Sequence, residues 1–404
     1  MLVMQTDYKW RESLIRFALI FMCFAFWRGG LQVIAFTLLI LAWVLDGGID
    51  RFKQVLKEPL VQAILLLCIV LLVGLSWSEY SLHGRIKWLK YFFLLLFIPF
   101  YSLLNPARLP WVLGSLLTSY GAVLGLGVYQ WQVLDVQGIP ALGMSYLSFS
   151  AILGAGVVVS IGMACTIREA WARWMLWVLA GVLLFIQFHQ GGRVLLLATF
   201  MALLLMVLLR HSLDTRKLFA IVGSLLIAVA VFAYSSPVFK ERFMFIKQDI
   251  ALLQQGNFSS SMGYRLAMWD VGLHGIAERP FLGYGTGMAQ VYFDRTIQTY
   301  KDGIYRELPS FQETSHFHND WIEIGMHTGI LGMSCLGFLY WAWYQSLRRR
   351  QLQIFAAGML CYIFIAGLTD SFLVFSKTPL LLLMITAIAL HWQSLSHQNH
   401  HKVG

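Results

Sequence analysis

The chain is dominated by apolar runs that are long enough to cross a lipid bilayer, which takes roughly 17–25 residues of helix. Of its 404 residues, 58% are hydrophobic and only 12% are charged. An ordinary soluble domain is about 25% charged. We therefore expect an all-α polytopic membrane protein.

Twelve such runs can be placed along the sequence, and one long polar segment separates the ninth from the tenth. We expect three parts: helices 1–9 within 1–236, a large outer loop at 237–316, and the last three helices with a tail at 317–404. The predicted spans lie near 13–28, 31–46, 58–77, 86–104, 111–134, 146–165, 171–188, 193–209, 217–236, 325–346, 354–375 and 378–393.

The basic residues predict the orientation of these spans. Most Lys and Arg side chains fall into the loops that are cytoplasmic if the N-terminus is cytoplasmic, as the positive-inside rule requires. Both termini are then cytoplasmic, the first helix is retained rather than cleaved, and the 237–316 loop lies outside. The net charge of +10 arises between apolar runs and accompanies no nucleic-acid-binding motif, so we expect membrane lipids as neighbours and no nucleic acid.

Four basic residues break this pattern because they face outward in short loops. Arg85, Lys87, Lys90 and Arg193 are either interfacial anchors whose stems lie along the lipid or members of a positive patch at the outer surface. The five cysteines all lie inside apolar runs and are interpreted as small packing residues, with neither a disulfide framework nor a metal site.

The outer segment has the pattern of a helix. Arg265, Trp269 and Leu273 recur at i, i+4 and i+8 on one face. The helix should end before Arg279-Pro280, since proline cannot continue it. The Gly283-Tyr-Gly-Thr-Gly287 sequence that follows lacks the strand and lysine of a nucleotide-binding loop, so we expect a simple turn.

The most concentrated group of ionisable residues is the stretch 313–332, with three histidines and three carboxylates. Such groups at a membrane border indicate a functional site. His316-x-His318-x-Asp320 resembles a run of metal ligands, but a catalytic zinc usually takes a third ligand from elsewhere. No companion histidine has suitable spacing, so we expect no metal.

The remaining interpretation is that His318 acts as a general base. Thr314 or Ser315 would cap the following helix and place His318 and Asn319 in its first turn. The positive end of a helix disfavours imidazolium and keeps a histidine neutral, whereas Asp320 and Glu323 act in the opposite direction.

Three arginines could serve a phosphate ligand. Arg193 follows two glycines, which would let a ligand approach the backbone closely. One guanidinium group can bind two phosphate oxygens at once, in a bidentate manner. Arg193, Arg265 and Arg279 could therefore together replace a metal around a diphosphate. Asp370 is the main carboxylate within a span, where it belongs to the outer site or pairs with Lys377.

These motifs together resemble the O-antigen ligase and polymerase superfamily. The matching pieces are Gln190-Gly-Gly-Arg193 at the start of a span, Arg265-Leu-x-x-Trp269 with Arg279-Pro-Phe-Leu-Gly283-Tyr-Gly-Thr-Gly287, and His318-Asn319 with Gly329-Ile-Leu-Gly332 downstream. The likeness covers most of residues 180–345 and the single large outer loop.

The resemblance implies a metal-independent, inverting glycosyltransferase of the GT-C type, without a cofactor, at the periplasmic face of the bacterial inner membrane. The donor would be a polysaccharide on undecaprenyl diphosphate, and the acceptor lipid A-core. His318 would deprotonate the acceptor hydroxyl, and Arg193, Arg265 and Arg279 would hold the diphosphate. Asn319, Arg85, Lys87 and Asp370 are expected to support this site.

Three alternatives remain open. An O-antigen polymerase uses the same lipid-linked donor with a second lipid-linked glycan as acceptor. A protein O-oligosaccharyltransferase usually carries extra sequence that this chain lacks. A polysaccharide transporter would need ionisable residues within its spans, and these are nearly absent here.

Overall fold

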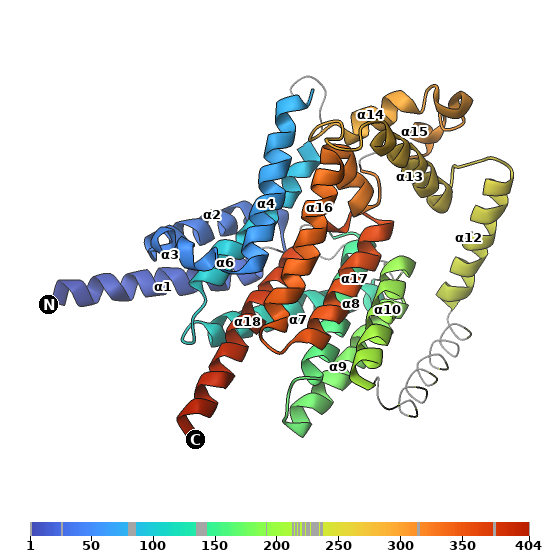
Figure 1. The fold of residues 1–404 in the computed structure, drawn as a ribbon. Coiled ribbons are helices and arrows are strands. Elements are labelled where there is room, and N and C mark those ends of the chain that lie inside the picture. Colours follow the sequence, from blue (N-terminus) through green and yellow to red (C-terminus); the bar gives the residue numbers. More distant parts are fainter. Residues whose placement is uncertain are drawn as a thin grey trace.

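The fold is helical throughout the part of the chain that the structure describes. The computed structural model describes residues 2–25, 27–79, 86–134, 144–190, 192–211, 237–312, 316–374 and 377–403, and isolated positions within 212–236. Every regular element in these ranges is an α-helix or a 3-10 helix (Figure 1). The expected all-α class is therefore confirmed for the described residues.

The elements follow one another along the chain in three groups. The N-terminal group is α1 (Leu2–Ala25), α2 (Gly29–Leu45), α3 (Gly48–Val55), α4 (Pro59–Val73), η1 (Gly74–Trp77), η2 (Ile86–Leu96), α6 (Phe97–Leu103), α7 (Leu109–Val133), α8 (Tyr146–Ala164), α9 (Ala170–Phe188) and α10 (Arg193–His211). The outer segment holds α12 (Pro237–Gln254), α13 (Ser261–Glu278), α14 (Ala289–Thr296), η4 (Tyr300–Gly303) and α15 (Leu308–Phe311). The C-terminal group is α16 (Asp320–Arg348), α17 (Gln353–Thr369), η5 (Phe372–Val374) and α18 (Lys377–Val403).

Six helices among the described residues are long and apolar enough to cross a membrane: Pro59–Trp77, α7, α8, α9, α10 and α16. The α2–α3 pair, bent by 93°, would make a seventh. The regions 353–369 and 377–392 are shorter apolar helices. The predicted span at 217–236 lies almost entirely outside the described residues, so the total of twelve stays a prediction.

One predicted span has a different form from the one expected. The 86–104 region divides into the 3-10 helix η2 and the α-helix α6, with the change at Phe97. Pro99 has no N–H to donate to the carbonyl of Leu95, and its ring crowds that carbonyl. A continuous α-helix through this point is therefore disfavoured.

The central bundle is formed by α4, α16, α17, α10 and α8. Helix α16 packs between α4 and α17, and α17 packs on α10 and α8 (Figure 1). Small residues allow close approach at these contacts, as is usual between membrane helices. A Cβ atom added to Gly358 of α17, for example, would lie only 2.3 Å from Met206 Sδ of α10.

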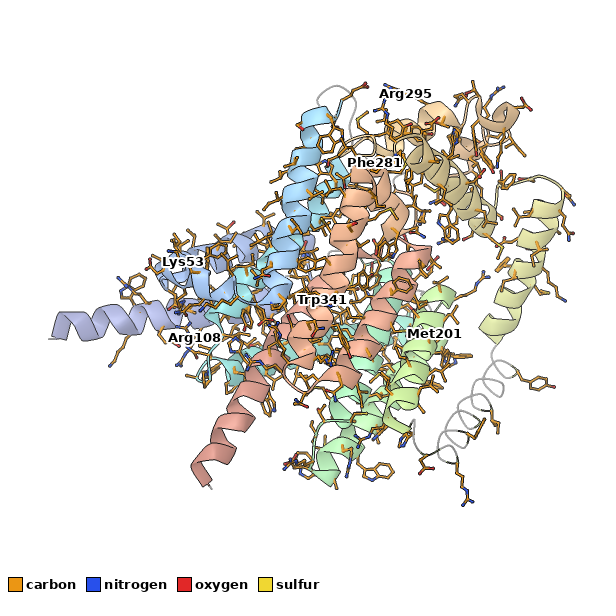
Figure 2. The ribbon with its side chains drawn as sticks, viewed as in Figure 1. Lys53, Arg108, Met201, Phe281, Arg295 and Trp341 are labelled. Atoms are coloured by element: carbon orange, nitrogen blue, oxygen red, sulfur yellow. The ribbon has the colours of Figure 1, made fainter. Side chains whose placement is uncertain are left out.

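A buried ion network joins the N-terminal helices at the end that we predict to be cytoplasmic. Arg108, labelled in Figure 2, is 5% exposed and donates hydrogen bonds to the carboxylates of Glu12 and Asp46 and to the carbonyl of Leu103. The guanidinium thus connects α1, the α2–α3 bend and the start of α7. Removing one partner from such a buried network costs more than removing a surface pair.

The outer segment forms its own small apolar cluster above the bundle (Figure 1). Tyr264 and Met268 of α13 pack there with Phe293 of α14 and with Phe317 and Met326 near the start of α16. Helix α13 ends at Glu278, and Arg279 is its C-cap. The predicted end before Arg279-Pro280 is therefore confirmed.

The segment from Pro280 to Thr286 docks into a break in α16. The backbone of α16 leaves helical geometry at Thr328 and Gly329. Its carbonyls at Met326 and His327 accept the N–H groups of Tyr284 and Gly285, at 2.9 and 3.0 Å. The glycine-rich turn thus has a structural role: it supplies hydrogen bonds to the break in α16 rather than binding a phosphate.

The same segment also reaches α4. The Thr286 hydroxyl donates to the carbonyl of Leu71 at 2.7 Å, and the Thr286 N–H donates to the carbonyl of Gly74 at 3.2 Å. Trp77 Nε1 donates to the carbonyl of Leu282 at 3.1 Å. These bonds fasten the outer segment to two membrane helices at once.

We predict that Gly329→Ala strongly destabilises the protein. Gly329 has φ 61° and ψ −151°, a region that is essentially restricted to glycine and costs other residues about 1–3 kcal/mol. A Cβ there would also lie 2.4 Å from the carbonyl carbon of Phe281 (labelled in Figure 2). The thermal midpoint of the detergent-purified variant should fall clearly.

Gly337→Ala is the matched control on the same helix. A Cβ at Gly337 would meet only Trp321, at an ordinary contact distance of 3.8 Å, and alanine favours helix over glycine. Its midpoint should be unchanged or higher. Equal midpoints for Gly329→Ala and wild type would contradict the proposed docking of the 280–286 segment.

Candidate active site

The centre of the site is the turn that leads into α16. Asn319, not Thr314 or Ser315, caps this helix: its Oδ1 accepts the N–H groups of Trp321 and Ile322 at 2.9 and 3.1 Å. The expected cap residues Thr314 and Ser315 lie outside the described residues. The prediction of His318 in the first helical turn is therefore wrong, because the helix begins two residues later, at Asp320.

His318 adopts a backbone conformation that is unusual for a residue with a side chain. Its φ is +50°, in the left-handed region, which disfavours non-glycine residues, although histidine is one of the types enriched there. Trp269 of α13 holds this turn by donating its Nε1 hydrogen to the His318 carbonyl at 3.2 Å. Such strain is found preferentially at functional sites.

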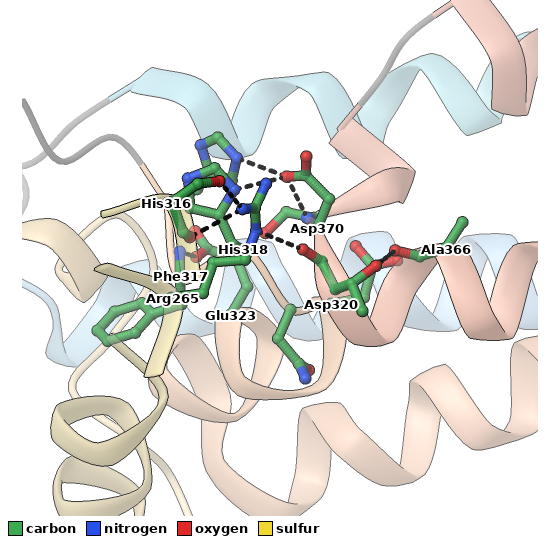
Figure 3. Close-up of polar contacts among 12 residues, drawn as sticks. Arg265, His316, Phe317, His318, Asp320, Glu323, Ala366 and Asp370 are labelled. Atoms are coloured by element: carbon green, nitrogen blue, oxygen red, sulfur yellow. Dashed lines mark hydrogen bonds and ion pairs between the residues drawn. The ribbon is translucent and has the colours of Figure 1, made fainter. Parts of the chain in front are cut away.

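The side chain of His318 lies against Asp370, which follows the end of α17. His318 Nδ1 and His316 Nε2 each lie 2.9 Å from the same Asp370 oxygen, Oδ1 (Figure 3). The Ser371 N–H also donates to that oxygen at 2.9 Å. His318 and Asp370 are each only 9% exposed, so this is a shielded histidine–carboxylate pair.

Asp370 has a larger place in the site than its expected supporting role. Lys377, the alternative partner considered from the sequence, instead donates to the carbonyl of Trp27. The pairing of Asp370 with His318 joins residues that are 52 positions apart, and no local pattern reveals it. The only sequence signal was a carboxylate within an otherwise apolar region.

Burial and hydrogen bonding act in opposite directions on this pair. Burial lowers the pKa of His318, the Asp370 carboxylate raises it, and the net shift is downward. Burial raises the pKa of Asp370, but the hydrogen bonds from His316 and His318 lower it more, so that its pKa lies well below the usual range. At neutral pH the arrangement is an ionised carboxylate next to a neutral imidazole.

The tautomer of His318 follows from this contact. A carboxylate only accepts hydrogen bonds, so the nitrogen facing it, Nδ1, must carry the proton. The lone pair of a neutral His318 is then on Nε2. An imidazole oriented in this way by a carboxylate can accept a proton from a hydroxyl group.

Arg265 and Arg193 line one pocket together with Asp370. The pocket has a volume of about 480 Å³ and is enclosed mainly by the starts of α8 and α10, by α13 and by the end of α17. Arg265 is fixed by its Nε donating to the Thr369 carbonyl at 3.1 Å, next to Asp370. The structure therefore brings together two of the three predicted arginines and the predicted base's partner.

Arg279 does not reach this pocket. It is exposed and stacks over the ring of Tyr284, 4.5 Å from the centroid. It stands at the other end of α13 from Arg265, about 20 Å away at the rise of an α-helix. The structure thus does not bring Arg279 together with the other two arginines, because one helix carries Arg265 and Arg279 at opposite ends.

The other expected supporting residues differ in position. Arg85 lies outside the described residues, and Lys87 is exposed on η2. Asn319 belongs to the site through the backbone: its Nδ2 donates to the Leu368 carbonyl at 2.9 Å, in addition to capping α16. Its role is to join the ends of α16 and α17.

The buried carboxylates of Asp320 and Glu323 have a structural role. From the sequence they were expected only to act on the charge of His318. Asp320 is fully buried, and its oxygens accept the N–H of Leu373 at 3.1 and 3.3 Å. Glu323 accepts the Phe317 N–H at 2.8 Å, between the two histidines. They fix the Asp370 segment and the histidine turn, respectively.

His316, His318 and Asp370 could also hold a metal ion by geometry. Each offers one ligand atom, and these atoms lie within 4.8 Å of one another, which suits the three protein ligands of a catalytic zinc. Asp320, the carboxylate of the metal pattern considered from the sequence, is not part of this group. The hydrogen bonds of both rings to Asp370 satisfy the same three side chains without an ion.

Comparison with known protein families gives a match. The family model described as O-antigen ligase matches residues 175–337. This region contains Arg193, Arg265, the docked glycine-rich segment and His318. A search of curated protein sequences gives no match.

We predict that Asp370→Asn lowers the pKa of His318 further. The carboxylate is the group that raises this pKa, so its neutralisation leaves the opposing effect of burial. The measurement is an NMR titration of the histidine ring C–H signals in detergent-solubilised protein. At a given pH, less of His318 should be protonated in the variant.

Asp249→Asn is the control, because Asp249 is a second carboxylate of the pocket and lies on α12. It should leave the His318 titration unchanged. A rise of the His318 pKa in Asp370→Asn, or an equal effect of both variants, would contradict the assigned pair.

Proposed function

We propose that this chain, whose residues 175–337 match the O-antigen ligase family model, transfers O-antigen polysaccharide from undecaprenyl diphosphate to lipid A-core. The observation that carries the proposal is the buried His318–Asp370 pair beside a pocket lined by two arginines. That pocket lies where membrane helices meet the outer segment, as a lipid-linked donor with a polar head would require.

In the proposed reaction, His318 removes the proton of the acceptor hydroxyl. Nε2 takes the proton, while Nδ1–H stays hydrogen-bonded to Asp370, whose negative charge stabilises the imidazolium that forms. The downward shift of the His318 pKa keeps the ring neutral before reaction. Such general-base catalysis contributes typically 10²–10⁴-fold in rate.

The leaving group is the lipid diphosphate, which gains charge as the glycosidic bond breaks. Arg193 and Arg265 line the pocket and would bind its oxygens, a form of electrostatic stabilisation at the departing group. The acceptor oxygen attacks the anomeric carbon from the side opposite the diphosphate, so the configuration is inverted. Because Arg279 is distant from the pocket, we assign no diphosphate contact to it.

The proposed location is the bacterial inner membrane, with the pocket on the periplasmic side. The apolar spans support the membrane assignment, and the distribution of basic residues supports the orientation. Donor and acceptor are both amphiphiles, so they would reach the pocket from the lipid. The GT-C type and the twelve spans form part of this proposal.

An O-antigen polymerase would use the same donor chemistry, and the two functions differ in their acceptor. The cellular products separate them. A cell without the ligase has core without polymer and accumulates full-length lipid-linked glycan. A cell without the polymerase has core that bears a single repeat unit.

We predict that His318→Ala fails to restore capped lipopolysaccharide in a strain from which the chromosomal copy has been deleted. In a purified assay with lipid-linked glycan, the rate should fall by at least about 10²-fold, as expected for loss of a general base. A lipopolysaccharide gel of the complemented strain should show uncapped core. Core with one repeat unit in the deletion strain would favour the polymerase.

His274→Ala is the matched control, since His274 lies on α13 and stacks on Tyr300, away from the pocket. It should support nearly normal capping. If His318→Ala protein is inserted at the normal level and remains fully active, the general-base role is wrong.

We further predict that EDTA leaves the transfer rate unchanged. Arg193 and Arg265 supply the positive charge that a metal would otherwise provide, and His316 and His318 are already hydrogen-bonded to Asp370. The assay is purified protein treated with chelator and then with added Mg²⁺ or Zn²⁺. A strong loss that one of these ions restores would instead assign the three side chains as metal ligands.

A further inference from the structure

The first turn of α10 forms one wall of the pocket. Arg193, Val194 and Leu195 all line it, and they are the first three residues of a helix of 19 residues. The first N–H groups of an α-helix have no partner within the helix, and together they carry a partial positive charge. Such an end favours an anion. The buried side chains next to it also indicate a ligand.

Two buried polar side chains beside this helix end lack partners. Ser150 is 0% exposed and Gln190 is 6% exposed. Ser150 Oγ and both amide atoms of Gln190 have no hydrogen-bond partner among the residues that the structure describes. A buried polar group without a partner is energetically unfavourable, so these atoms call for a ligand or ordered water.

Both residues are next to the start of α10. Gln190 precedes Arg193 by three residues, and Ser150 lies against Gly192, where an added Cβ would be only 2.6 Å from its Oγ. Ser150 also follows Tyr146 and Leu147, which line the pocket, by one turn of α8. The unpartnered hydroxyl thus lies at the junction of the two helices that form this wall.

The neighbouring buried polar groups are paired. Gln187 Nε2 donates to the Ser150 carbonyl at 3.2 Å, and Thr199 Oγ1 donates to Gln187 Oε1 at 3.1 Å. Tyr362 donates its hydroxyl hydrogen to the Ala151 carbonyl at 2.9 Å. These groups between α8, α10 and α17 are satisfied, whereas Ser150 and Gln190 beside the α10 start lack partners among the described residues.

We propose that Ser150, Gln190 and the first-turn N–H groups of α10 form a phosphate-binding subsite for the lipid-linked diphosphate. The inference rests on the proposed function and extends its donor site beyond the arginines. The Ser150 hydroxyl and the Gln190 amide nitrogen donate to non-bridging oxygens of one phosphate, and Arg193 and Arg265 neutralise the charge. Both atoms are shielded from solvent in this structure, so the phosphate enters with a shift of the side chains around them.

Loss of either side chain should weaken ligand binding without destabilising the free protein. Ser150→Ala and Gln190→Leu remove groups that have no partner before the ligand binds, so the free protein should lose no hydrogen bond. Its thermal midpoint should be equal to or higher than that of wild type. Binding of undecaprenyl diphosphate should weaken by roughly tenfold for each change, because hydrogen bonds to charged groups are lost.

The experiment uses the full-length protein in nanodiscs, with no acceptor present. Thermal unfolding and titration are measured with undecaprenyl diphosphate, inorganic pyrophosphate and phosphatidylglycerol for wild type, both variants and the double variant. Ser160→Ala, a buried serine two to three turns along the same helix, is the control and should bind like wild type. Because only binding is measured, a failure of glycan transfer leaves this test valid.

The expected result is weaker binding of both diphosphate compounds with an unchanged or raised midpoint in the absence of ligand. Binding within twofold of wild type in both variants would overturn the subsite. A lowered midpoint with unchanged binding would also overturn it and would indicate a structural role. Equal loss of phosphatidylglycerol binding would assign the subsite to ordinary lipid head groups instead.

Discussion

The hydrogen bonds at the C-terminal end of α17 hold the candidate site together. The last carbonyls of a helix have no partner within it, and here the site residues supply donors. Asn319 donates to the Leu368 carbonyl and Arg265 to the Thr369 carbonyl, while the next residue, Asp370, accepts from two histidines. One helix end therefore holds Asn319 and Arg265 and is followed by Asp370, which contacts His318.

Keeping a carboxylate ionised where little water reaches it is costly unless it is hydrogen-bonded. Asp370 has three donors on one oxygen, which compensates for its burial. Asp320 and Glu323 are buried nearby and accept backbone N–H groups. These scaffolding carboxylates explain why acidic residues lie close to His318 in the sequence although the carboxylate that contacts its ring, Asp370, is 52 positions away.

The sequence predicted those features that depend on local composition. Continuous apolar runs identified most helices, and Arg279-Pro280 identified the end of α13. The i, i+4 spacing placed Arg265 and Trp269 on one face of α13, and both line the pocket. Features that depend on distant contacts were missed. The cap of α16 is Asn319 rather than an earlier residue, and Asn319 also bonds to α17. The pairing of His318 with Asp370 requires the packing of two helices.

The break in α16 has a mechanical consequence. Within a membrane span, freed backbone groups find no water, so each must be satisfied by protein. The 280–286 segment does this for Met326 and His327, and it is also fastened to α4. Pulling the outer segment away at this edge would break both sets of bonds in a medium that offers no replacement. Along this edge, these bonds therefore hold the outer segment to both α16 and α4, and they restrict movement of the outer helices relative to the bundle.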